Sequence, residues 1–327
     1  MNDISRYTKK RIPLAFIFLL ATSLQGCGGS TSVEEHLQQA RASFAKYDLK
    51  SSEIELKNVL QQDTNNSAAR LLLGQIYLTI GNAPAAIIEI NKAIQTNQSS
   101  DTAFSLLGDA LLLDGKADEI LTRFASNPTE TDSLKAVKAT YRGDANLQLK
   151  DIDSAKSAYQ TALQYDAQND RTLLGMARIA ILENKPDKAL ELTNSVLSKD
   201  PNHVMALLTK ADVYRALGNK SETISAFTQA AHASNPKEQF NFIAIRNLTI
   251  EHLQNGNLAE AEKQLQILVT GPYKQRVTND PMLSYTQAII AYDKKDLATA
   301  KEIAERIVAN TNNFPQLQLL LGSINLQ

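Results

Sequence analysis

Small and apolar residues recur along this chain with a period close to 34 residues, in stretches of helical spacing separated by polar turns. The residues that recur between two neighbouring stretches are Leu73 and Leu107, Gly74 and Gly108, Tyr77 and Leu111, Gly81 and Gly115, Ala86 and Ile120, and Ala93 and Asn127. Repetition at this period is typical of a solenoid in which one supersecondary unit is stacked many times.

Each repeat is predicted to be a helix, a short turn and an antiparallel helix. The turns carry Gly followed by a polar residue, and Gly at this place ends a helix without strain because it tolerates a left-handed conformation. These turns are Gly81-Asn82, Gly115-Lys116, Gly218-Asn219 and Gly256-Asn257. Pro201 and Pro281 favour helix starts, where the missing N–H costs nothing. Small residues at Gly74 and Ala86 let helices approach closely, and Ile90 fills the space between them.

The pattern predicts about eight units after residue 32. Their ranges are 33–66, 67–100, 101–135, 136–169, 170–203, 204–237, 242–275 and 281–314, with a partial unit at 315–327. In the third unit Asn127 and Pro128 interrupt the pattern, so we expect its second helix to stop near Ala125 and a loop to run through Thr131. That loop either bends the solenoid, binds a partner or reflects a degenerate repeat.

The stretch 315–327 is predicted to be the first helix of another unit. It has no second helix to pair with in the sequence, and it is rich in leucine. Two interpretations stay open: the chain is part of a longer array, or this helix docks in place or against another protein.

Residues 1–26 have the pattern of a secretory signal peptide. Four cationic residues between Arg6 and Arg11 precede an uncharged run from Ile12 to Ser23. Twelve residues span about 18 Å as a helix, which is short of a hydrocarbon core of about 30 Å. The run ends in Leu24-Gln25-Gly26-Cys27, which resembles a bacterial lipobox. The resemblance implies cleavage before Cys27 and acylation of its thiol, with residues 27–32 as a short lipidated tether. Gly28 stands where an Asp commonly marks inner-membrane retention, so the same resemblance implies the periplasmic face of the outer membrane.

Composition and charge narrow the possible functions. The chain has 34 basic and 35 acidic residues, so no overall field draws it to nucleic acid. The chain has 13 Gly and 9 Pro residues. Together they make up a smaller fraction of the sequence than the usual roughly 12%, which argues against a turn-rich β fold. One cysteine, four scattered histidines and the absence of phosphate-loop, nucleophile-elbow or metal-ligand motifs predict no catalytic site, no metal, no cofactor and no small-molecule substrate.

The small residues at Gly74, Ala86 and Ala93 and the 34-residue period resemble the tetratricopeptide repeat. The resemblance implies an all-α fold, a right-handed superhelix of paired helices, in which the first helix of each unit lines a groove that binds protein partners. The groove positions then supply Gln75, Leu78, Asp109, Leu112, Asp144, Leu147, Arg178, Ile181, Asp212 and Arg215. A polar row beside an apolar row suits an extended peptide or a helix.

A narrower resemblance comes from the opening units, at Ser32–Glu35, Ala45–Asp48, Ile54–Leu60 and Ala69–Gly74. These stretches resemble the tetratricopeptide lipoproteins of exosortase/PEP-CTERM sorting systems, and they imply a scaffold that assembles an envelope export complex for exopolysaccharide. Two alternatives remain: a pilotin-like lipoprotein that guides an outer-membrane secretin or barrel, and a glycan-binding solenoid using aromatic residues such as Tyr285 and Tyr292.

Overall fold

The computed structural model describes residues 31–96, 100–234, 239–271, 277–278, 280–310 and 314–326. The chain divides into two compact units, Met1–Ser32 and Val33–Gln327. Only Thr31 and Ser32 of the first unit are described, so the predicted signal peptide at 1–26 and the predicted lipid site at Cys27 lie outside the described residues. The second unit is all-helical throughout its described part, as the repeat pattern predicts.

Helices in the second unit follow one another in pairs joined by turns of about three residues. Their bounds are α1 Val33–Ala45, α2 Leu49–Gln62, α3 Ser67–Thr79, α4 Ala83–Gln95, α5 Asp101–Leu113, α6 Ala117–Arg123, α7 Asp132–Gln148, α8 Ile152–Tyr165, α9 Asp170–Leu182, α10 Pro186–Lys199, α11 Val204–Ala216, α12 Lys220–Ala233, α13 Gln239–Gln254, α14 Leu258–Thr270, α16 Pro281–Asp293, α17 Leu297–Asn310 and α18 Pro315–Asn325.

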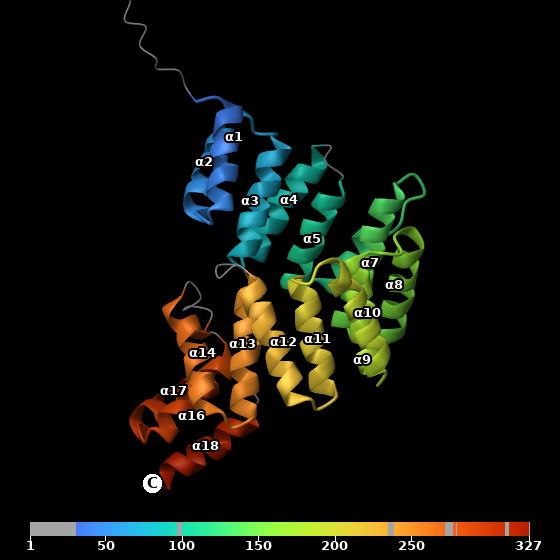
Figure 1. Ribbon diagram of the computed structural model, residues 1–327. Coiled ribbons are helices and arrows are strands. Elements are labelled where there is room, and N and C mark those ends of the chain that lie inside the picture. The colour runs from blue at the N-terminus through green and yellow to red at the C-terminus, as the bar shows by residue number, and fades with distance from the viewer. Residues whose placement is uncertain are drawn as a thin grey trace, which may run out of the picture. The chain divides into compact units, whose positions relative to one another are not determined.

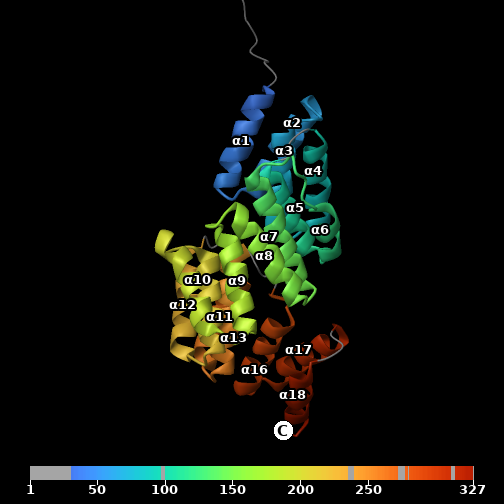
Figure 2. The same cartoon turned by 90° about the vertical axis from the view of Figure 1, so that its right-hand side faces the viewer.

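The helices stack in chain order (Figure 1). Each first helix packs against its own second helix, and the second helix packs against the first helix of the next pair, as α3, α4 and α5 do. First helices also contact one another directly along the series α1, α3, α5, α7, α9, α11, α13, α16 and α18. Figure 2 shows this arrangement from the side, with α5, α7, α9 and α11 following one another. The first helices therefore form one continuous layer, and we call its solvent side the first-helix face.

A residue in the left-handed conformation follows the first helix in each of the eight helix pairs that the structure describes. These residues are Tyr47, Gly81, Gly115, Lys150, Asn184, Gly218, Gly256 and Lys295, with φ between 57° and 79°. The following helix is often capped by a polar side chain: Asp48 accepts a hydrogen bond from the Ser51 N–H, and Asp151 accepts one from the Ser154 N–H. The four glycine turns expected from the sequence thus share their geometry with four turns that use other residues.

The third pair departs from the others. Its second helix, α6, ends at Arg123 and α7 begins at Asp132, which confirms the loop predicted between Ala125 and Thr131. The loop is anchored, because Phe124 is buried and Lys138 on α7 forms an ion pair with Glu130. Because the Thr131 hydroxyl caps α7, this helix begins four residues before residue 136, where the repeat pattern places the start of a unit.

At several glycines in the core, a large side chain of another helix packs directly against the backbone. A Cβ added at Gly74 would lie 2.6 Å from Ile90 Cγ1, and one at Gly108 would lie 2.3 Å from the Tyr141 ring. The ring of Tyr159 lies between two glycines: a Cβ at either Gly143 or Gly175 would come within 2.4 Å of it. Close approach at small residues, expected from the sequence, is therefore a general feature of this stack.

Helix α18 docks in place through one face. Leu317, Leu320 and Ile324 are buried and join the same apolar cluster as Ala288 of α16 and Ile307 of α17. Within the described residues, no helix is both long enough and apolar enough to cross a bilayer.

Candidate functional site

The ten residues predicted for the groove lie on first helices, two on each of α3, α5, α7, α9 and α11. Gln75 and Arg215 are exposed, and Asp144 is buried. The other seven are partly exposed: Leu78, Asp109, Leu112, Leu147, Arg178, Ile181 and Asp212. Whether these residues bind a partner stays a prediction, but their positions and contacts define two polar clusters.

The first is the Arg171 cluster, formed by Asp109, Tyr141, Asp144, Tyr159 and Arg171. Arg171 Nε donates to Asp144 Oδ2 at 2.6 Å, and its Nη1 donates to Asp109 Oδ1 at 2.8 Å and to Tyr141 Oη at 2.9 Å. Its guanidinium also lies 4.1 Å from the centroid of the Tyr141 ring. One side chain of α9 is thus bonded to α7 and to α5, two helix pairs away.

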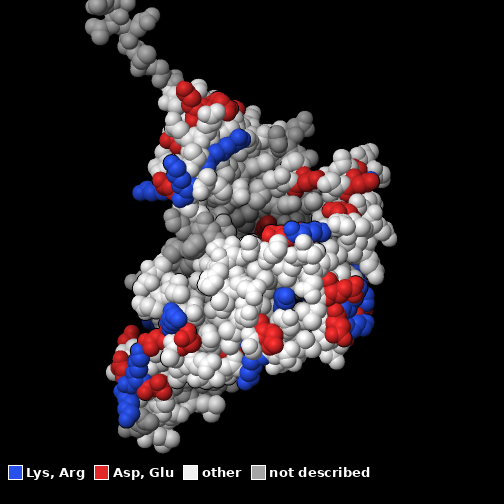
Figure 3. All heavy atoms as spheres, in the orientation of Figure 1, with Lys and Arg blue, Asp and Glu red and all other residues white. Residues whose placement is uncertain are grey.

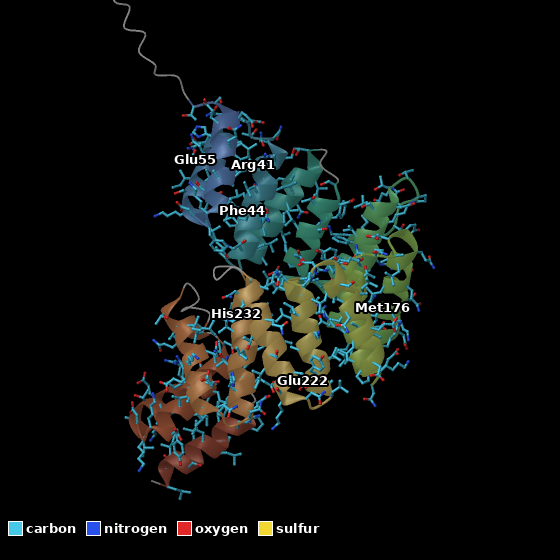
Figure 4. The ribbon with its side chains drawn as sticks, in the orientation of Figure 1. Arg41, Phe44, Glu55, Met176, Glu222 and His232 are labelled. Carbon is cyan, nitrogen blue, oxygen red and sulfur yellow. The ribbon has the colours of Figure 1, made fainter. Side chains whose placement is uncertain are left out.

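Tyr159, on α8, is the last member of the Arg171 cluster. Its hydroxyl donates to Asp144 Oδ1 at 2.6 Å, and its fully buried ring packs with Met176 and Ile179 of α9. Figure 4 labels Met176 on that helix. Asp144 therefore has a hydrogen-bond partner on each carboxylate oxygen, which compensates for its burial.

Electrostatics in the Arg171 cluster favour one protonation state. Burial raises the pKa of Tyr159, and the neighbouring Asp144 carboxylate raises it further, so the phenol stays protonated as a donor. Burial raises the pKa of Tyr141 as well, with Asp109 adding to the effect. For Arg171, burial alone would lower the pKa, but Asp144, Tyr141 and Asp109 outweigh it and hold the pKa above its usual value.

The second is the Arg215 cluster, formed by Asp212, Arg215, Phe227 and Glu251. Arg215 pairs with Asp212 at 2.9 Å and with Glu251 at 3.1 Å, and its guanidinium lies 4.8 Å from the centroid of the Phe227 ring. Burial raises the pKa of Asp212 against the opposing effects of Arg215 and Arg178, although 45% of its side chain is exposed.

The charge of Arg178 acts on both clusters. It is partly exposed, and its charge acts on the pKa of Tyr159 on one side and of Asp212 on the other. Arg171 and Arg215 are each held by two carboxylates, whereas Arg178 has no carboxylate partner within the described residues. Its guanidinium is therefore available to an anionic group of a ligand.

A small cleft adjoins the Arg215 cluster. It has a volume of about 200 Å³ and is lined by Arg215, Lys220 and Glu251 among other polar residues. Lys220 at the start of α12 is exposed and brings a second positive charge to its rim. The lining of the cleft carries charged side chains of both signs, so it suits a polar side chain of a bound segment better than an apolar small molecule.

Charge on the molecular surface is mixed. Figure 3 shows acidic and basic side chains interspersed over the visible face, in agreement with the net charge of −1. No group of three or more metal-ligating side chains occurs in the part of the chain that the structure describes. The histidines are dispersed along the chain: His36 pairs with Glu55 across α1 and α2, His203 caps the start of α11, and His232 lies on α12 (Figure 4).

Sequence reasoning missed Arg171, which organises the first cluster. Its partners Asp109 and Asp144 were both among the predicted groove residues, and the signal for a partner was there: two acidic residues at equivalent positions of successive units. The arginine itself lies 62 residues from Asp109, a separation that no local pattern reveals.

A stack of antiparallel helix pairs with a continuous first-helix layer defines an α-solenoid, a class whose extended surfaces bind other proteins. The description "Tetratricopeptide repeat" belongs to the family model that matches residues 43–110 and 146–211. The family model therefore identifies tetratricopeptide repeats in these two segments of the solenoid.

Relatives and solved structures with such repeats share part of this sequence. DnaJ homolog subfamily C member 3 of Homo sapiens is 27% identical over 128 residues, which cover 38% of this chain and 25% of the relative. The mouse protein of that name is matched over 46% of its length, so the chain spans less than half of these relatives. A tetratricopeptide repeat protein from Parabacteroides merdae is 16% identical with a TM-score of 0.43, covering 91% of this chain and 100% of that one. PilW, a type IV pilus biogenesis factor, is 17% identical with a TM-score of 0.48, covering 64% and 96%.

Proposed function

We propose that this protein is a lipid-anchored scaffold of a bacterial cell envelope that binds protein partners along its first-helix face. The observation that carries the proposal is Arg178, which has no carboxylate partner in the described part of the chain and whose charge acts on two ordered polar clusters of that face. Ordered arginine–carboxylate pairs fix the shape of the face before a partner arrives, so less entropy is lost on binding.

The partner segment is expected to be extended or helical and to carry a carboxylate opposite Arg178. An arginine binds a carboxylate through two parallel hydrogen bonds, which sets the orientation of the segment as well as its affinity. Ile181, three residues after Arg178 on α9, and Leu147 on α7 are partly exposed and can provide apolar contacts.

Site-specific photocrosslinking in cells tests the binding face. A photoreactive residue at Gln75, Arg178 or Arg215 is expected to join partners, whereas one at exposed Lys188 on α10, a second helix, is expected to remain unlinked. Arg178→Glu is expected to abolish capture at Gln75 and Arg215, and Arg178→Lys to retain part of it. Equal crosslinking at Lys188 would contradict the proposal.

The identity of the captured protein distinguishes the envelope roles. Export or sorting components of an exopolysaccharide system support the role implied by the opening units. A captured secretin or barrel protein supports the pilotin-like alternative instead. A mobility shift in polysaccharide affinity gels, without protein capture, supports the glycan-binding alternative.

The lipid anchor needs a separate test. Cys27→Ser is expected to abolish incorporation of labelled palmitate and to release the protein from membranes, because the thiol is the proposed acylation site. A Cys27→Ser variant that stays membrane-bound and labelled would show that the anchor is elsewhere. Both results are independent of the crosslinking pattern.

A further inference from the structure

Four successive turns within helix pairs each expose one leucine and one lysine. The turns join α5 to α6, α7 to α8, α9 to α10 and α11 to α12. We call these eight residues the turn-edge row: Leu113 and Lys116, Leu149 and Lys150, Leu182 and Lys185, and Leu217 and Lys220. Described helix pairs precede and follow all four turns, so the row is exposed in the middle of the stack.

The turn-edge row lies along one edge of the stack. Because every second helix reverses the chain, the first helices run in the same direction and their C-terminal ends share this edge. Gln148 near the end of α7 donates to the carbonyl oxygen of Leu112 near the end of α5 at 3.1 Å, and Lys156 of α8 pairs with Glu183 in the next turn. Packed helices are about 8–10 Å apart, so the four turns extend over about 30 Å.

The leucines of the row are exposed as separate side chains. Leu182 is 62% exposed, Leu149 44%, Leu113 43% and Leu217 40%. Spaced by about 8–10 Å, they do not form one continuous patch. A bilayer takes up isolated aliphatic side chains one by one at the boundary between headgroups and acyl chains, whereas a protein partner needs a matching pocket for each.

Two lysines of the row project farther than the carboxylates with which they pair. The exposed fraction of the side chain is 48% for Lys116 and 21% for Asp114, and it is 60% for Lys185 and 26% for Glu183. These two turns therefore present their ammonium groups to the solvent more than their carboxylates.

The other two lysines have no carboxylate partner within the described residues. Lys150 and Lys220 are both exposed, and the Asp151 carboxylate beside Lys150 accepts a hydrogen bond from the Ser154 N–H. Further acidic residues of this edge lie in the first turn of the second helices, where the positive end of the helix dipole offsets part of their charge: Asp118, Glu119, Asp153, Asp187 and Glu222. Lys150 and Lys220 therefore offer uncompensated positive charge beside exposed leucines.

We propose that the turn-edge row lies on the surface of a phospholipid bilayer, with its leucines at the acyl boundary and its lysines on the lipid phosphates. A lysine suits this place because its long apolar stem can follow the leucines while the ammonium group stays in water. Composition favours a bilayer over a protein partner, because protein interfaces are enriched in aromatic residues, Met and Arg and depleted in Lys. The row consists of leucine and lysine alone.

The contact orients the stack. Since the C-terminal ends of the first helices meet the bilayer, these helices stand roughly upright on it, and the first-helix face stays open to partners. Four partly exposed leucines bind a bilayer weakly and reversibly, as a single acyl chain does. The row therefore sets the orientation of a chain that is already held at a membrane, and it depends neither on the lipid at Cys27 nor on the first-helix face.

An environment-sensitive label reports contact of this edge with lipid. Leu149→Cys or Leu182→Cys, in the full chain with Cys27→Ser to remove the other thiol, is labelled with the fluorophore NBD. On vesicles of phosphatidylethanolamine and phosphatidylglycerol, we expect a blue shift and quenching by lipids with a nitroxide on the acyl chain. Ser195→Cys, exposed on α10, is the control and is expected to keep its aqueous emission. Each label reports its own surroundings, so attachment elsewhere in the chain does not produce the signal.

Substitutions elsewhere in the row test both residue types, with the label kept at position 182. Leu113→Ser combined with Leu217→Ser is expected to lower the ratio of shifted to unshifted label about tenfold. Ile54→Ser, at a 50% exposed isoleucine of α2, is the matched control and should leave the ratio unchanged. Lys150→Gln combined with Lys220→Gln is expected to lower the ratio about tenfold on these vesicles, and to have little effect on vesicles of phosphatidylcholine alone.

The proposal is overturned if the labels at 149 and 182 keep their aqueous emission at saturating lipid, or if the label at 195 shifts equally. It is also overturned if the paired leucine substitutions leave the ratio unchanged. A photoreactive residue at Leu182 should join phospholipid in cells; if it joins one protein instead, the row is a protein interface and the bilayer proposal fails. None of these measurements uses Arg178 or an intact Cys27, so partner binding and the lipid anchor keep their own tests.

Discussion

Gly143→Ala is expected to destabilise the stack, because the added methyl has no space. Its Cβ would lie 2.4, 2.5 and 2.8 Å from three atoms of the Tyr159 ring. The ring cannot retreat readily, since it is fully buried, faces Gly175 on another side and is held by its hydrogen bond to Asp144.

The magnitude follows from two opposing effects. Overpacking of a tight core costs about 1–3 kcal/mol, and the sandwiched ring places this site near the upper end. Alanine is the better helix former by about 1 kcal/mol, which offsets part of that cost. We expect a net loss of about 2 kcal/mol in the free energy of unfolding.

Gly322→Ala is the matched control. It makes the same change inside α18, where the added Cβ meets nothing within 4 Å. Only the helix preference remains, so we expect a gain of about 0.5–1 kcal/mol. Urea denaturation followed by circular dichroism at 222 nm measures both variants. If Gly143→Ala matches or exceeds the unmodified protein in stability, the packing argument is refuted.

Three further predictions concern charge, protonation and backbone strain. Arg171→Met is expected to lower the free energy of unfolding by about 1–3 kcal/mol, because it leaves buried Asp144 without its cation. The loss is smaller than for a fully buried pair, since 40% of the Arg171 side chain is exposed. Lys301→Met, at an exposed ion pair 4.0 Å apart, should change the free energy of unfolding by less than about 0.5 kcal/mol. Burial lowers the pKa of His252, so stability is fully present above the unfolded value near 6.5 and falls as the pH drops below it; His252→Leu should flatten this part of a pH–stability profile. Lys150→Gly should raise the melting temperature, because Lys150 has φ of 65°.

Each of these has a result that would contradict it. Equal losses for the arginine and lysine variants would show that the Arg171 cluster contributes no more than a surface pair. A pH profile that His252→Leu leaves unchanged between 5 and 7 would assign the acid sensitivity to other groups. A lower melting temperature for Lys150→Gly would mean that the flexibility of glycine in the unfolded chain outweighs the relief of strain.

The paired-helix fold was predictable because its determinants are local. A small residue at a fixed place in each repeat, such as Gly74, and a turn glycine such as Gly81 appear directly in the sequence. The turns at Tyr47 and Lys150 were less visible, because a non-glycine residue in the left-handed region is selected by its surroundings and not by its own preference. The early start of α7 likewise depends on a single capping hydroxyl.

The candidate site was only partly predictable for the same physical reason. Helical spacing placed Asp144 and Asp212 correctly on first helices, but it could not show that one is buried and paired while the other is partly exposed. Arg171 joins three successive first helices, and such a contact depends on the rise and rotation between pairs, which the sequence does not encode at any one position.

The span of Arg171 from α9 to α5 has a mechanical consequence. Most other contacts join helices of the same or the adjacent pair, so a pulled chain should unravel in steps of one repeat, each releasing about 120 Å of contour length at about 3.5 Å per residue. From α5 to α9 the guanidinium ties successive pairs together. That section should resist force as a single block and yield in one longer extension, which would give the solenoid a stiff middle between two compliant ends.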